Sequence, residues 1–206
     1  MEVISTEKDY EPIAIGVENI LNRSKTLPDK VFKESFNFFL FITFDELFMP
    51  EFFLKHLKYY LSYTGEDTFW VTTIDPDPRL YFGYHFDFWG AVKFSTLDTE
   101  NEYLSALNNY PQDSPADALA HNSNLLMFFS PTNKWAVYGD RNAGIAVCAF
   151  TNREQMERFK SIYGSDLLEG VKLAAEYAYG KVGKYDLIKK LCNSYVANSG
   201  DTIPIK

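Results

Sequence analysis

Cysteine and histidine are scarce in this chain of 206 residues, which contains two cysteines and three histidines. Cys148 and Cys192 each lie among apolar neighbours, a setting that favours buried thiols over a disulfide framework. The three histidines, His56, His85 and His121, have no metal-binding spacing to one another or to a cysteine. We therefore expect neither a zinc site nor another metal cofactor.

Positive charge and long apolar segments are also lacking. The chain has 20 Lys and Arg residues against 28 Asp and Glu residues, a net charge of −8 at pH 7. This balance disfavours binding to nucleic acid or to an anionic membrane surface. The most apolar run, residues 36–44, is far shorter than the roughly 18 residues that a membrane-spanning helix needs. The amino terminus has no basic segment followed by a long apolar stretch, so we expect a cytoplasmic protein.

Two motifs that would indicate catalysis are missing from the sequence. No glycine-rich phosphate loop follows a predicted strand, and no Gly-x-Ser-x-Gly turn offers a serine nucleophile. We therefore expect no nucleotide or other cofactor, and we expect that the protein is not an enzyme.

Aromatic and acidic side chains, by contrast, are abundant. Phe, Tyr and Trp make up 17% of the residues, a proportion that suits both a large core and a partner-binding surface. Residues 1–150 contain 11 basic and 21 acidic side chains, whereas residues 151–206 contain 9 and 7. The acidic part would attract a basic protein and speed its encounter. The alternative is that this charge only serves solubility.

The order of apolar patterns predicts an α+β fold in one domain over residues 1–206. We expect an antiparallel sheet of about five strands, flanked by N-terminal and C-terminal helices. Helical spacing of apolar residues in the first third predicts several helices. One of them begins near Asp29, and another runs from Pro50 to Gly65. Residues 36–44 fit a helix and a strand equally well. Three helices are expected at the carboxyl end, over residues 151–163, 166–179 and 184–197.

The middle of the chain alternates between apolar and polar residues with a period of two, which is typical of strands. The clearest alternation runs from Tyr81 to Phe94, after a proline-rich turn at residues 75–79. Thr99 and Glu102 then form a capping box that predicts a short helix. A further strand is predicted over residues 124–129, and residues 135–150 predict a β-hairpin with a polar, glycine-containing turn.

One face of the predicted strand from Tyr81 to Phe94 combines an imidazole with a carboxylate. His85 and Asp87 are two residues apart on that face, and Asp75 lies in the turn just before it. Such groups can ligate a divalent cation or perform acid–base chemistry. A small hydrolase or metal-dependent enzyme is therefore one alternative. The other is that these side chains are solvated or face a partner protein.

The same face also predicts a recognition surface, because tyrosine and tryptophan offer large contact areas and dominate protein-binding hot spots. The candidate contact residues of this first patch are Asp75, Asp77, Tyr81, His85, Asp87 and Trp89. A second patch on the hairpin comprises Trp135, Tyr138, Asp140 and Arg141. If a helix instead covers the first patch, Trp89 belongs to the core. Asp140 and Arg141 could also simply pair across the hairpin turn.

The hairpin carries a resemblance to a known class of proteins. The segment Lys134-Trp-Ala-Val-Tyr-Gly-Asp-Arg-Asn-Ala-Gly-Ile-Ala146 resembles a hairpin motif of bacterial immunity proteins, which neutralise polymorphic or contact-dependent toxins. The resemblance covers residues 130–150. It implies a non-enzymatic cytoplasmic protein that binds one cognate toxin, and a basic toxin domain would match the acidic first 150 residues. A third interpretation is a structural protein that assembles with copies of itself through an exposed aromatic face.

Overall fold

The computed structural model describes residues 1–86, 88–164, 167–168, 170–180 and 183–195. Within these residues, seven strands form one antiparallel sheet with the order β1-β4-β3-β5-β6-β7-β2. The strands are β1 (Glu2–Val3), β2 (Phe38–Thr43), β3 (Thr68–Asp75), β4 (Ala91–Ser95), β5 (Leu125–Phe129), β6 (Trp135–Asp140) and β7 (Ile145–Phe150). The fold is therefore α+β, as the sequence predicts, with more strands than expected.

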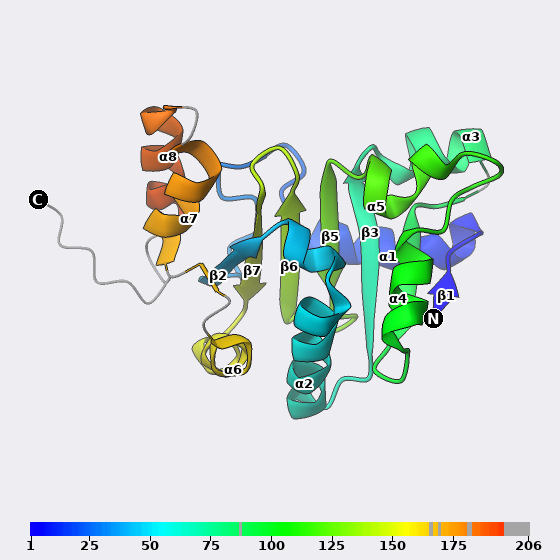
Figure 1. Ribbon diagram of the computed structural model, residues 1–206, viewed down its shortest axis with the longest axis horizontal. Coiled ribbons are helices and arrows are strands. Elements are labelled where there is room, and N and C mark those ends of the chain that lie inside the picture. Colours follow the sequence, from blue (N-terminus) through cyan, green and yellow to red (C-terminus); the bar gives the residue numbers. More distant parts are fainter. Residues whose placement is uncertain (87, 165–166, 169, 181–182, 196–206) are drawn as a thin grey trace, which may run out of the picture.

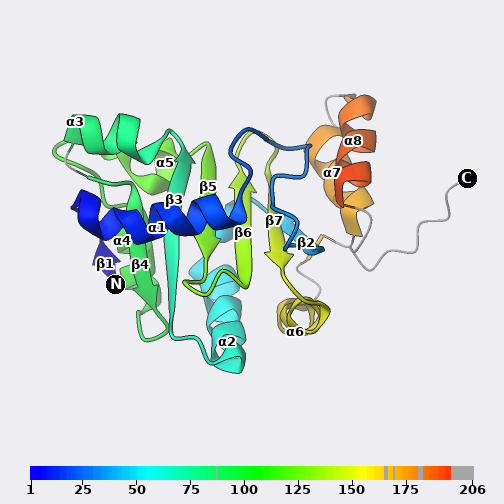
Figure 2. The same cartoon turned by 180° about the vertical axis from the view of Figure 1, so that it is seen from behind.

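Helices lie on both faces of this sheet (Figure 1 and Figure 2). The longer helices are α1 (Glu7–Ile20), α2 (Lys55–Thr64), α4 (Glu100–Leu107), α6 (Arg153–Tyr163), α7 (Gly170–Tyr179) and α8 (Tyr185–Tyr195). Shorter helical segments are η1 (Asp45–Phe48), η2 (Pro50–Leu54), η3 (Pro78–Gly83), α3 (Tyr84–Phe86), η4 (Pro115–Asp117) and α5 (Leu119–Asn122). Helices α2, α4 and α6 cover one face, and α1, α7 and α8 lie on the other. Within the described residues, no helix is long and apolar enough to cross a membrane.

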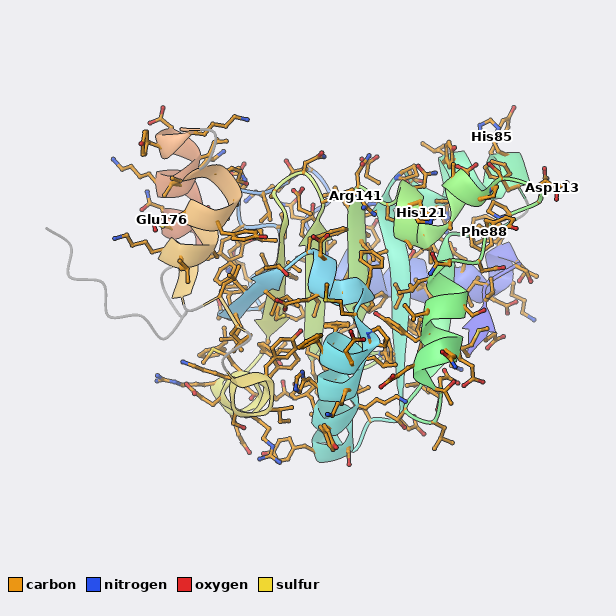
Figure 3. The ribbon with its side chains drawn as sticks, viewed as in Figure 1. His85, Phe88, Asp113, His121, Arg141 and Glu176 are labelled. Carbon is orange, nitrogen blue, oxygen red and sulfur yellow. The ribbon has the colours of Figure 1, made fainter. Side chains whose placement is uncertain are left out.

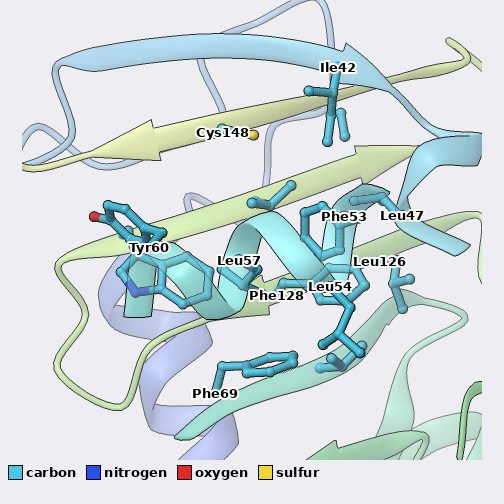
Figure 4. Packing of buried hydrophobic residues seen from close by; sticks show 14 of the residues in the cluster. Ile42, Leu47, Phe53, Leu54, Leu57, Tyr60, Phe69, Leu126, Phe128 and Cys148 are labelled. Carbon is cyan, nitrogen blue, oxygen red and sulfur yellow. The ribbon is translucent and has the colours of Figure 1, made fainter. Parts of the chain in front are cut away.

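The two faces of the sheet give the core two layers. The layer beneath α2, α4 and α6 contains Phe53, Tyr60 and Phe128, all fully buried (Figure 4). The layer beneath α1, α7 and α8 contains Phe41 and Phe129. Strands β6 and β7 are buried on both faces, and most of their residues are apolar. An alternation of apolar and polar residues therefore does not show which of their side chains are exposed.

Helix α1 lies unusually close to the sheet. It begins at Thr6, whose side-chain oxygen accepts a hydrogen bond from the Asp9 backbone nitrogen (3.2 Å). A Cβ atom added at Gly16 would lie 2.4 Å from the ring of Phe129 on β5. The glycine therefore sets the distance between the helix and the sheet.

The helix predicted to begin near Asp29 is wrong, and residues 36–44 contain a strand. Every residue of β2 pairs with a residue of β7, from Phe38 with Phe150 to Thr43 with Ile145. The spacing of the phenylalanines in this segment is compatible with a helix. Pairing with a strand more than 100 residues later in the chain decides the conformation instead.

The strand predicted from Tyr81 to Phe94 is wrong over its first half, because η3 and α3 precede β4. Pro78 occupies the first turn of η3, where its fixed φ suits a helix. The Asp77 side chain caps this turn by accepting hydrogen bonds from the backbone nitrogens of Arg79 (2.9 Å) and Leu80 (3.1 Å). A period of two would place Phe82 and Tyr84 on one face of a strand, but Phe82 is buried and Tyr84 is exposed, as on opposite sides of a helix. The capped proline turn therefore overrides the aromatic alternation.

The three helices predicted at the carboxyl end are present as α6, α7 and α8. The expected start of the second helix, residue 166, and the expected end of the third, residue 197, lie outside the described residues. The predicted capping box is also present: Thr99 and Glu102 exchange side-chain and backbone hydrogen bonds of 2.6 and 3.2 Å at the start of α4.

Candidate functional site

The hairpin patch is buried. Trp135, Tyr138 and Asp140 each retain at most 7% of their surface. Their strand β6 lies between β5 and β7, and core layers cover both of its faces. The prediction that these three side chains contact a partner is therefore corrected: they are part of the interior.

Trp135 belongs to a polar anchor near the end of α2. Its indole Nε1 donates a 2.8 Å hydrogen bond to the Glu66 carboxylate. The same carboxylate accepts hydrogen bonds from the hydroxyls of Ser130 and Thr132, in the turn that leads into β6. One carboxylate thus fixes the turn between β5 and β6, and the tryptophan that opens the hairpin has a structural role.

Asp140 and Arg141 fix the other end of β6. The Asp140 carboxylate accepts a hydrogen bond from the Ala143 nitrogen (2.9 Å), and burial raises the pKa of Asp140. The Arg141 guanidinium donates to the carbonyl oxygens of Ala120 (2.8 Å) and Ser123 (2.9 Å). Arg141, predicted as a partner contact or as a pair for Asp140, therefore connects the hairpin to α5 and the residue after it.

The two aspartates that open the first patch make contacts within the protein. Asp75 ends β3 and accepts a hydrogen bond from Asn124 Nδ2 (3.0 Å). Asp77 caps η3 and also forms an ion pair with Arg23 (2.6 Å). The two carboxylates therefore hold the base of η3 against the residue before β5 and the chain after α1.

Tyr81 and His85 lie one helical turn apart, with ring centroids separated by 5.6 Å. The Tyr81 hydroxyl donates a 2.7 Å hydrogen bond to Asp117, which raises the pKa of Tyr81 and connects η3 to η4. His85 is exposed and projects from α3 away from the sheet (Figure 3). The strand face predicted to join His85 to Asp87 does not exist, since His85 is helical; Asp87 lies outside the described residues.

Trp89 is half-buried and packs against the core layer beneath α1. Its ring stacks on Tyr10 of α1 with centroids 5.2 Å apart. Burial raises the pKa of Tyr10 to about 12, so this hydroxyl remains neutral beside the indole at ordinary pH. Helix α1 therefore covers part of Trp89, but the side chain stays half-buried at the edge of the core.

Sequence reasoning missed the most exposed apolar residues of this segment. Leu80 and Tyr84 are 77% and 81% exposed, one helical turn apart. The signal that could have found them is the Asp77-Pro78 start of a helix, because a helix with Phe82 facing inward turns both residues outward. We call the residues Leu80, Tyr81, Tyr84 and His85 the tip surface.

A groove of about 900 Å³ lies between α1, Trp70 of β3 and the turn before β6. Its lining includes Glu7, Glu11, Ile15, Trp70, Pro131 and Asn133, none of which the sequence analysis singled out. Glu11 also forms an ion pair with Arg79 of η3. This ion pair connects one wall of the groove to the segment that carries the tip surface.

The described residues show no cluster of metal-ligating side chains. No three or more His, Cys, Asp or Glu side chains in that part of the chain are placed to hold a metal ion. Cys148 lies in β7, and burial raises the pKa of its thiol, which disfavours the reactive thiolate. The exposed surfaces described above present aromatic rings, apolar side chains and carboxylates.

The sequence matches no protein-family model, and no curated protein or solved structure is significantly similar to it. The fold class alone does not define a function, because one architecture can support many unrelated activities. The exposed surfaces are therefore the features from which function is inferred.

Proposed function

We propose that this protein is a non-enzymatic binding protein that contacts a basic protein through the tip surface, and that its partner is a toxin domain which it neutralises. The observation that carries the proposal is the exposure of Leu80 and Tyr84 (77% and 81%) on one short helical segment. A leucine and a tyrosine presented together to solvent form the apolar, aromatic centre that protein-binding hot spots contain.

The tip surface is held in place from below. Phe82 is completely buried, and Pro78 is buried beside it. The hydrogen bond from Tyr81 to Asp117 fixes the same segment to η4. Because this support orders the backbone before any partner arrives, binding would cost little conformational entropy.

The charge around the tip surface favours a basic partner. Arg79 is paired with Glu11, and Arg23 is paired with Asp77, so these four charges cancel in pairs. Asp113 is exposed and lies on the same side of the molecule as His85 (Figure 3). With 11 basic and 21 acidic side chains in residues 1–150, this part of the protein would attract a cationic surface. The hairpin resemblance to immunity proteins adds support for a toxin as the partner.

The test begins with the tagged protein and a lysate of its source organism, from which the bound protein is identified by mass spectrometry and then purified. Its affinity is measured for the wild type and for Tyr84→Ala and Leu80→Ala. Leu97→Ala is the matched control, because Leu97 is 88% exposed elsewhere on the surface. We expect both tip variants to weaken binding about tenfold or more, and the control to bind like the wild type.

Cell growth then tests neutralisation. Expression of the partner alone should arrest growth, co-expression of the wild-type protein should restore it, and co-expression of Tyr84→Ala should restore it poorly. A partner that binds both tip variants as tightly as the wild type contradicts the proposed surface. A tip-dependent partner that does not affect growth contradicts neutralisation.

A further inference from the structure

The outward face of η2 and α2 carries large apolar side chains where a surface helix is normally polar. Met49 and Phe52 are each 40% exposed, and Tyr59 and Tyr63 are 60% and 46% exposed. Seven residues separate Phe52 from Tyr59 and four separate Tyr59 from Tyr63, so the rings follow one side of the helix. Figure 1 shows α2 on the near side of the sheet. We call these four residues the α2 stripe; exposed apolar surface of this extent marks a contact with another molecule.

The charge around the α2 stripe differs from that of the whole chain. Helix α2 and the neighbouring α6 together contain five basic and two acidic side chains, whereas the whole chain contains 20 and 28. A basic protein would be repelled from this face. Two copies of an acidic chain, by contrast, would repel each other least where they meet through this face. The charge therefore separates the occupant of the α2 stripe from the basic partner of the tip surface.

The two ends of the α2 stripe carry opposite charges. Glu51 is exposed at the amino end, next to Phe52. At the carboxyl end, the Arg158 guanidinium of α6 lies 4.6 Å from the centre of the Tyr63 ring. The Tyr63 hydroxyl donates a 2.7 Å hydrogen bond to Glu154, so that carboxylate is already bound. Within the described part of the chain, neither Glu51 nor Arg158 forms an ion pair.

The two ends also differ in shape. A groove of about 470 Å³ lies between α2 and α6 at the carboxyl end, and its lining includes Tyr59, Tyr63 and Ile162. Because Tyr63 contacts both Glu154 and Arg158 of α6, one wall of this α2–α6 groove is fixed before any molecule binds. The amino end instead presents the exposed side chains of Met49 and Phe52. One end of the stripe thus offers apolar side chains, and the other offers a hollow that can receive them.

We infer that two copies of this chain pair through the α2 stripe, with their α2 helices antiparallel. Phe52 of each copy then enters the α2–α6 groove of the other, and Glu51 of each copy lies next to Arg158 of the other. Each contact occurs twice, as the two-fold symmetry of a homodimer requires. The opposite character of the two ends selects a second copy, because the face is complementary to itself only when it is turned end over end. This homodimer goes beyond the proposed function, since the tip surface lies on η3 and α3, away from α2 (Figure 1).

The first test measures the mass of the full-length protein by sedimentation equilibrium over a range of concentrations. We expect a dimer with a dissociation constant of about 100 μM or tighter. Tyr59→Glu places a charge in the middle of the α2 stripe and should weaken the dimer about tenfold or more. Tyr185→Glu is the matched control, because Tyr185 is 76% exposed on α8, and this variant should pair like the wild type. Circular dichroism checks that both variants are folded.

An exchange of charges tests the contact between the two copies directly. Arg158→Glu and Glu51→Arg should each weaken the dimer about tenfold, since either change brings like charges together at two symmetric places. The single variants are not sufficient, because Arg158→Glu also removes the contact with the Tyr63 ring. The double variant should recover most of the lost affinity, because opposite charges then meet again with their positions exchanged.

Three results would overturn the inference. A mass of one chain at about ten times the expected dissociation constant means that the α2 stripe does not join two copies and is left to a different molecule. Equal pairing of the wild type and Tyr59→Glu places the self-contact on another face. A double variant as weak as the single variants contradicts the antiparallel arrangement. None of these results bears on the tip surface, whose variants Leu80→Ala and Tyr84→Ala leave α2 unchanged.

Discussion

The hairpin of β6 and β7 and the tip surface on η3 and α3 have similar residues and opposite environments. Each contains tyrosine and lies next to aspartate, yet Tyr138 of the hairpin is buried and Tyr84 of the tip is 81% exposed. The hairpin has a strand on either side and core layers on both faces. The tip surface is supported from one side, by the buried Phe82, and its Leu80 and Tyr84 side chains are exposed. Composition therefore does not predict which aromatic segment is exposed; the number of sides covered by other elements decides it.

The largest expected effect is on stability, from a substitution in the buried hairpin. Trp135→Ala removes a large core side chain and its hydrogen bond to Glu66. The free energy of unfolding should fall by about 3–5 kcal/mol, measured by urea denaturation. A loss below about 1 kcal/mol would show that the hairpin is not the rigid element described here.

Arg141 tests whether the turn end of the hairpin is equally structural. Arg141→Ala leaves the carbonyl oxygens of Ala120 and Ser123 without their donor and should cost about 1–3 kcal/mol of unfolding free energy. Arg153→Ala is the matched control, because Arg153 is exposed and pairs only at 3.8 Å with Glu157. Its effect should stay within about 0.5 kcal/mol. Equal losses in the two variants would contradict a special role for Arg141.

A substitution at Tyr138 should not lower stability. Its hydroxyl is buried and has no hydrogen-bond partner among the described residues, and burial raises the pKa of Tyr138. Tyr138→Phe removes this unsatisfied group and keeps the ring, so stability should be unchanged or rise by about 1 kcal/mol. Thermal unfolding measures the difference. A clear loss of stability would mean that the hydroxyl has a partner after all.

The smallest expected effect on stability belongs to the tip. Tyr84→Ala removes an exposed ring, so its unfolding free energy should stay within about 0.5 kcal/mol of the wild type. Partner affinity should fall in the same variant, which separates recognition from stability. A large destabilisation by Tyr84→Ala would place this side chain in the core and end the contrast with the hairpin.

Elements determined by neighbouring residues were predictable from the sequence. The capping box at Thr99 marks the start of α4, and the hairpin between Trp135 and Phe150 forms with those two residues paired. Strand β2 was not predictable, because its conformation depends on β7, far away in the chain. The segment after Asp77 was mispredicted for a different reason: its aromatic residues alternate with the period of a strand, but the Asp77 cap and Pro78 start a helix there.

The candidate site was less predictable than the fold class. The sequence singled out Tyr81 and His85 of the tip surface, but it did not identify Leu80 or Tyr84. The groove joins α1 to Trp70 and to the turn before β6, which are far apart in the sequence. A surface assembled from three distant segments leaves no local pattern, so only the packed structure reveals it.

The packing of α1 on the sheet has a consequence for how such a protein could acquire new partners. Gly16 fixes the position of the helix from its inner side, against Phe129. Glu7 and Ile15 line the groove, whereas Glu11 also pairs with Arg79 of η3. Substitutions at Glu7 and Ile15 would therefore change the chemistry of the groove without altering the glycine contact that positions the helix. One helix thus keeps the residues that set its position apart from the residues that set the character of the surface beside it.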